Sequence, residues 1–109
     1  MELLSRTEEL ILLAIHELGD EAYGISIREH LEEHVGKKFS VGAVYVPLER
    51  LTSRGFLKSS ETEPVAERGG RRKRIYRITA KGVAALKETK ALQDKFWKRI
   101  PDIATLKAK

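Results

Sequence analysis

The chain has 109 residues, of which 41% are hydrophobic and 34% charged, and it contains no cysteine. Length and composition predict one small domain with a hydrophobic core, and the lack of cysteine excludes disulfides, cysteine-ligated metals and thiol nucleophiles. No apolar run approaches the roughly 20 residues of a membrane-spanning helix, and the first residues lack the basic start of a secretory signal. We therefore expect a cytoplasmic protein without a membrane partner.

Charge is distributed unevenly along the chain. Residues 1–36 hold two Lys or Arg against nine Asp or Glu, whereas residues 37–79 hold eleven against four and residues 80–109 eight against three. The net charge is +5, and its uneven distribution favours one face that binds a polyanion. The alternative is a basic surface that is only solvated.

A first helix is predicted over residues 5–18. Ser5 and Glu8 have the spacing of a capping box, and Gly19 is a stop signal. Its apolar side chains span an arc of roughly 200°, about twice what a surface helix needs. This width predicts two neighbours for the helix, one of which can belong to a second copy of the chain.

A second and a third helix follow closely. The second is predicted over residues 23–36, and the third begins at the N-cap Ser40 and ends at Gly55. Pro47 removes one hydrogen bond inside the third helix, so we expect a kink or a loosening of its first two turns.

The second half of the chain predicts a β-hairpin and one long helix. Residues 56–61 and 74–78 are short strand-like runs around a long loop that contains a glycine pair. Thr79 caps a fourth helix that continues to about Ile100, before Pro101. The apolar residues of this helix form a narrow stripe, typical of a helix-pairing seam, at Ala85, Thr89, Leu92, Phe96 and Ile100.

Three helices followed by a hairpin is the order of a winged helix-turn-helix domain, whose third helix enters the DNA major groove. We therefore predict a mainly α fold with a small β-hairpin. A winged helix-turn-helix DNA-binding domain would cover residues 1–80, a dimerisation helix residues 81–101 and a tail residues 102–109. Because winged domains also serve as protein-binding modules, a module that binds protein or RNA is the alternative function.

Five local segments carry a more specific signal. They are LILLAI at residues 10–15, AYGI at 22–25, GAVY at 42–45, GFL at 55–57 and GGRRKRIYRITAKG at 69–82. In this order they resemble the PadR family of transcriptional regulators, over roughly residues 10–86. One departure is that the family usually places Pro directly after the helix tyrosine, whereas here Val46 intervenes before Pro47.

The resemblance implies a repressor that binds double-stranded DNA as a homodimer. The chain ends soon after one long helix, as in the short-tailed members of the family, in which the last helix pairs across the dimer. Some family members sense aromatic or phenolic small molecules. An effector would act by changing the angle between the two winged heads.

The third helix is predicted to read DNA with its polar face. Tyr45 can donate to a phosphate, Glu49 can accept from a cytosine amino group and Val46 can contact a thymine methyl. The alternative is that Tyr45 packs under the hairpin and Glu49 only pairs with Arg50 or another neighbour. The predicted DNA-binding residues of this region are Ser40, Gly42, Ala43, Tyr45, Val46, Glu49 and Arg50.

The hairpin is predicted to contact the DNA backbone. Its cations are Arg68, Arg71, Arg72, Lys73 and Arg74. Guanidinium groups suit phosphate oxygens, and a Gly-Gly tip can approach the backbone closely. A solvated charged loop is the alternative interpretation.

The first and last helices are predicted to form the dimer. The interface residues would be Leu10, Ile11 and Ile15, together with Ala85, Thr89, Leu92, Phe96 and Ile100. Trp97, beside this stripe, can stack on an aromatic effector. Simple dimer packing is the alternative role for Trp97.

No cofactor, metal or catalytic activity is predicted. His30 and His34 stand four residues apart on the second helix, a spacing that can ligate a metal, but the sequence shows no third ligand. His16 is interpreted as a surface residue or a partner of the helix dipole. Nucleotide-binding loops and the nucleophile motifs of hydrolases are missing from the sequence, so the protein is not expected to be an enzyme.

Overall fold

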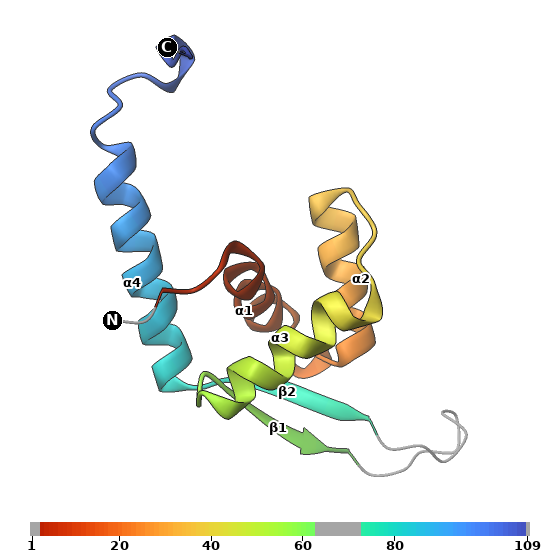
Figure 1. Cartoon of the computed structure of the whole chain (residues 1–109). Coiled ribbons are helices and arrows are strands. Elements are labelled where there is room, and N and C mark those ends of the chain that lie inside the picture. Colours follow the sequence, from red (N-terminus) through yellow and green to blue (C-terminus); the bar gives the residue numbers. More distant parts are fainter. Residues whose placement is uncertain (1–2, 63–72, 109) are drawn as a thin grey trace.

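Figure 1 shows a computed structural model of the chain, which describes residues 3–62 and 73–108. The elements follow in the order α1 (Arg6–Leu18), a 3-10 turn (Gly19–Glu21), α2 (Gly24–Val35), α3 (Val41–Ser53), β1 (Leu57–Glu61), β2 (Arg74–Ile78), α4 (Ala80–Trp97) and a second 3-10 turn (Ile103–Thr105). The predicted mainly α winged-helix fold with one small hairpin is confirmed. No helix in the described ranges is long and apolar enough to cross a membrane.

The start of α1 is fixed by its capping residues. Ser5 Oγ accepts a hydrogen bond from the Glu8 backbone N–H at 3.1 Å, and Glu8 Oε1 accepts one from the Ser5 N–H at 2.8 Å. This capping box satisfies two backbone donors that have no partner inside the helix. The buried Glu8 carboxylate also pairs with Arg54, the residue after α3, at 3.1 Å. The start of α1 is therefore tied to the end of α3.

The short connection between α2 and α3 is held by two side chains of α2. Arg28 Nε donates to the Phe39 carbonyl at 3.0 Å, and Glu32 Oε2 accepts from the Phe39 N–H at 2.8 Å. Arg28 and Glu32 lie one turn apart on the same face of the helix, so both reach Phe39. Ser40 Oγ then caps α3 by accepting from the Ala43 N–H at 3.1 Å. These contacts determine the direction in which α3 leaves the turn.

Pro47 does not interrupt α3, which continues from Val41 to Ser53 as one helix. Proline removes only the hydrogen bond that its own N–H would donate to the Ala43 carbonyl, one turn earlier. The predicted loosening of the first two turns is not observed. The Ser40 cap and burial of the inner face hold this region together, the buried residues being Val44, Leu48 and Leu51.

β1 and β2 form an antiparallel sheet in which Leu57 lies opposite Ile78. The other edge of β2 is covered by the segment before α2. The Tyr76 N–H donates to the Ala22 carbonyl at 2.9 Å, and Tyr23 forms a single bridge with β2. These backbone bonds place the hairpin against the N-terminal end of α2.

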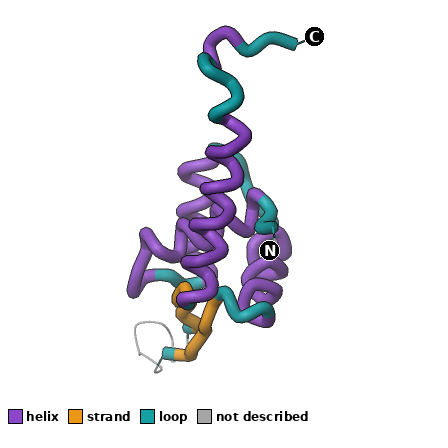
Figure 2. Tube along the Cα trace, turned by 90° about the vertical axis from the view of Figure 1, so that its left-hand side faces the viewer, coloured by secondary structure: helices purple, strands orange, loops and turns teal. Residues whose placement is uncertain are grey.

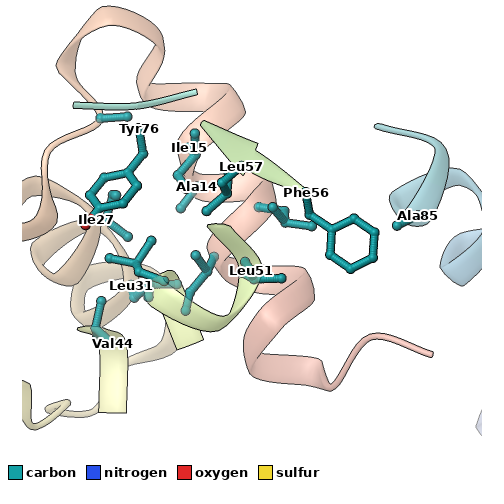
Figure 3. Close-up of a cluster of buried hydrophobic side chains, with 14 residues drawn as sticks. Ala14, Ile15, Ile27, Leu31, Val44, Leu51, Phe56, Leu57, Tyr76 and Ala85 are labelled. Atoms are coloured by element: carbon teal, nitrogen blue, oxygen red, sulfur yellow. The ribbon is translucent and has the colours of Figure 1, made fainter. Parts of the chain in front are cut away.

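The core lies where α1, α2, α3 and the hairpin meet (Figure 3). α1 packs against α2, α3, β2 and α4, so the chain's own elements cover most of its wide apolar arc. Leu13 remains 45% exposed. The largest fully buried side chains are Ile11, Leu12, Ile15, Ile27, Val44, Leu48 and Leu51.

This packing corrects part of the predicted dimer interface. Ile11 and Ile15 are 0% and 2% exposed, so they have no surface left to offer a second chain. Ala85 and Thr89 of α4 are also buried against their own domain. Leu10 is partly buried against the same core. The apolar periodicity correctly identified inward-facing residues, but their partner is the same chain.

α4 has a packed half and a projecting half. Its first turns lie against the domain, and Gln93 Nε2 donates to the Glu9 carboxylate of α1 at 3.1 Å. Beyond this contact the helix extends past α1 (Figures 1 and 2), where Phe96 is 63% exposed. The helix ends at Trp97, one turn before the predicted Ile100.

Candidate nucleic-acid interface

One side of α3 is exposed along its whole length. It carries all the α3 residues that were predicted to contact DNA, namely Gly42, Ala43, Tyr45, Val46, Glu49 and Arg50. Val46 is 56% exposed although it is apolar, which suits contact with a thymine methyl. Ser40 is exposed as well, but its hydroxyl accepts the capping bond of α3. In the described residues Glu49 and Arg50 form no ion pair, so both charged groups are available at this surface.

Tyr45 lies over the N-terminal end of α2. A Cβ atom at Gly24 would lie 2.7 Å from Tyr45 Cε1, so the absence of a side chain at Gly24 lets the ring sit there. Tyr45 is 37% exposed. Its ring lines one hollow together with residues of α2 and the hairpin, namely Tyr23, Gly24, Ile25, Lys73, Arg74 and Tyr76.

Tyr76 is a buried residue of β2 that lies beside α3. Burial raises the pKa of its phenol above the ordinary value, Arg74 opposes that shift, and Tyr45 and Glu49 add to it. A raised tyrosine pKa means that the hydroxyl keeps its proton at physiological pH and remains neutral. Tyr45 lines one hollow with Arg74 and Tyr76, and Glu49 lines a second hollow with the same two residues. The exposed face of α3 and the hairpin therefore form one continuous surface.

Two of the five predicted hairpin cations lie in the described residues. Lys73 Nζ lies 4.9 Å from the centroid of the Tyr23 ring, and Arg74 is exposed with its Nη2 3.8 Å from Glu61 Oε1. Both cations border the hollow that Tyr45 also lines. Arg68, Arg71 and Arg72 lie outside the described residues.

Four residues that shape this surface were missed by the sequence analysis. Tyr23 and Tyr76 meet here because β2 pairs with the segment before α2, a contact that leaves no local signal. Arg28 and Glu32 do have the four-residue spacing of a helix-face pair. Their common target, Phe39, becomes evident only when the turn is folded.

We expect Glu32→Ala to loosen the turn before α3. The change removes the acceptor of the Phe39 N–H, and a hydrogen bond to a charged group contributes about 1.5–3 kcal/mol. Because Glu32 is partly exposed, we expect the lower end of this range in a chemical denaturation measurement. Glu33→Ala is the matched control, since Glu33 is an exposed carboxylate on the same helix. An equal loss of stability in both variants would contradict the role of Glu32.

One group of three potential metal ligands occurs in the described part of the chain. It joins His30 and His34 of α2 to Glu17 of α1. The sequence analysis identified the histidine pair but not the third ligand, because Glu17 lies on a different helix. The same analysis predicted no metal for this reason.

The fold is shared with known transcriptional regulators. A PadR-like regulator from Bacillus cereus superposes with a TM-score of 0.72, covering 92% of each chain at 23% identity. A PadR family regulator from Clostridium difficile superposes with a TM-score of 0.66 at 26% identity, covering 88% of this chain and 94% of the other. A PadR-like transcription factor from Bacteroides fragilis superposes with a TM-score of 0.70 at 25% identity, covering 88% of this chain and 90% of the other.

Sequence comparison identifies the family directly. None of the curated proteins matches the sequence. The model of the transcriptional regulator PadR-like family matches residues 11–88, which span the domain from α1 to the first half of α4. These residues include the exposed face of α3 and the hairpin. The chain therefore belongs to the PadR-like family of transcriptional regulators, which are DNA-binding proteins and not enzymes.

Proposed function

We propose that the protein binds duplex DNA in a sequence-specific manner, as a homodimeric repressor that an effector releases. The observation that supports this most is the continuous surface formed by α3 and the hairpin. It combines exposed small, apolar and polar groups on α3 with the cations Lys73 and Arg74. A helix of this kind fits the major groove, while cations beside it neutralise phosphates.

Selection of bound sequences from a random duplex pool tests this proposal. Two copies of α3 on a two-fold axis read inverted half-sites roughly 34 Å apart, one turn of DNA. We expect the selected sequences to show such a repeat, and the affinity to fall steeply with salt. A module that binds protein would show no salt-dependent DNA binding, and one that binds RNA would prefer single strands.

Glu49→Ala should relax base preference while keeping DNA binding. Loss of an acceptor for a cytosine amino group removes about 1–3 kcal/mol of discrimination at one base pair. Removal of a negative charge from the interface should also strengthen binding to unrelated sequences. The measurement compares affinities for the selected site and for its single-base variants. Glu88→Ala is the control, because Glu88 is an exposed acid on α4 and the charge change is the same. If Glu49→Ala left the relative affinities for the single-base variants unchanged, the assignment of Glu49 to base contact would be contradicted.

Dimerisation is proposed through the projecting half of α4. Leu92, Phe96 and Ile100 continue the stripe whose first half, at Ala85 and Thr89, packs on the chain's own domain. A second chain would cover this continuation of the stripe. Covering exposed apolar side chains is favourable, at about 25 cal/mol for each Å² removed from water.

Phe96→Asp should convert the dimer into a monomer and weaken DNA binding. A charge placed in an apolar interface must be desolvated without a partner, which strongly disfavours association. The only tryptophan, Trp97, reports the change, because its emission should shift to the red when the partner leaves. Val83→Asp places the same charge on an exposed residue at the opposite side of α4. Light scattering that shows the same mass for both variants would contradict the proposed interface.

An aromatic effector is proposed to bind beside Trp97. This side chain is 51% exposed and lines an apolar hollow with Leu92, Phe96, Ile100 and Leu106. A ring stacked on Trp97 would lie at the proposed dimer contact and change the angle between the two heads. Phenolic acids that quench Trp97 emission and release DNA at the same concentration would support this role, and quenching without release would contradict it.

A further inference from the structure

Glu17, His30 and His34 form a cluster that DNA binding does not use. His30 Nε2 lies 3.4 Å from Glu17 Oε2, and the centroids of the two imidazole rings are 4.3 Å apart. One potential ligand atom from each residue lies within 4.8 Å of the other two. Imidazole nitrogen and carboxylate oxygen are ligands that zinc and neighbouring transition metals accept.

The distances suit a small cation. Bonds of about 2.0–2.1 Å in a tetrahedron place the ligand atoms roughly 3.3 Å apart. Glu17 and His30 already have this separation. His34 must move closer, and its exposed position in the last turn of α2 allows a change of rotamer. The His30 side chain is only 16% exposed and that of Glu17 67% exposed, so the site would be anchored on one side and open to a water ligand on the other.

The surroundings also favour a cation. The cluster belongs to the acidic first third of the chain. Residues 1–36 contain nine acidic residues and only two basic ones. Glu29 and Glu33 are exposed on the same helix as the two histidines. A negative local potential raises the concentration of cations at the surface. The cluster involves the later turns of α2, whereas the proposed DNA surface uses its N-terminal end.

We propose that Glu17, His30 and His34 bind one Zn²⁺ or a similar transition-metal cation and thereby join the end of α1 to α2. The unfolded chain does not hold these three ligands together, so the metal stabilises the folded state. Mg²⁺ and Ca²⁺ prefer sites made of oxygen ligands and would not substitute. The proposal goes beyond the regulatory function and does not depend on it.

Zinc titration of the untagged 109-residue chain tests the site. Calorimetry should give one Zn²⁺ per chain, and the melting temperature should rise with Zn²⁺ but not with Mg²⁺. His34→Gln and Glu17→Gln change exposed side chains, so the domain should still fold. Each variant should weaken Zn²⁺ binding by about tenfold or more, since removal of even an indirect partner of a metal ligand has an effect of that size.

His16→Gln is the matched control, because His16 is the remaining histidine and lies exposed on α1 outside the cluster. It should bind Zn²⁺ as the unaltered protein does. Equal binding by His34→Gln, Glu17→Gln and the unaltered protein would overturn the proposal. So would an unaltered protein whose melting temperature does not respond to Zn²⁺, or one that responds equally to Mg²⁺.

Discussion

Replacing Gly82 of α4 by alanine is expected to destabilise the domain much more than replacing Gly42 of α3. The added Cβ would lie 2.7 Å from Ile78 Cγ1 and well inside van der Waals contact of the Phe56 carbonyl oxygen. A backbone oxygen cannot turn aside as a side chain can, so α4 would have to move away from the hairpin. Overpacking of this kind costs about 1–3 kcal/mol.

Thermal unfolding followed by circular dichroism measures this effect. In a domain of this size each kcal/mol lowers the melting temperature by roughly 4–8 °C. Gly42→Ala is the control, because a Cβ at Gly42 meets nothing within 4 Å and alanine favours the helix by about 0.5–1 kcal/mol. A melting temperature for Gly82→Ala equal to that of Gly42→Ala would show that α4 is not held as closely as the structure indicates.

The double change Lys73→Ala and Arg74→Ala should weaken binding to every duplex to a similar degree. A dimer would lose four phosphate contacts, and at about 1 kcal/mol for each contact its Kd would rise on the order of 10³-fold. The slope of log affinity against log salt should become shallower by about 0.9 for each lost contact. Because the proposed contacts are to phosphates, the preferred DNA sequence should stay the same.

Fluorescence anisotropy across a range of salt concentrations gives both the Kd and the slope of log affinity against log salt. The double change Lys98→Ala and Arg99→Ala is the control, since it removes the same charge from exposed residues just after α4, on the part of the chain that projects away from the hairpin (Figure 1). We expect only a small loss of DNA affinity for this control. Equal losses for the two double variants would mean that net charge alone, and not the hairpin, accounts for the affinity.

The local features of the fold could be predicted from the sequence because their signals act between near neighbours. The capping box of Ser5 and Glu8 and the Ser40 cap involve residues three positions apart, and both form as expected. Gly36 ends α2 with a left-handed backbone, at a φ of 79°, which glycine adopts without a side-chain clash. The exposed face of α3 follows from its apolar period, which shows which side is buried.

Contacts between elements distant in the sequence were decided only by the tertiary structure. Apolar periodicity predicted that Ile11 and Ile15 are buried, but a periodic pattern contains no information about which surface covers them. The meeting of Glu17 with His30, and of Arg28 with Phe39, depends on the angle at which two helices pack. That angle results from the combined packing of many side chains in the core, which no short segment specifies. The sequence by itself thus determined the elements and their buried faces, and the three-dimensional packing determined the partners.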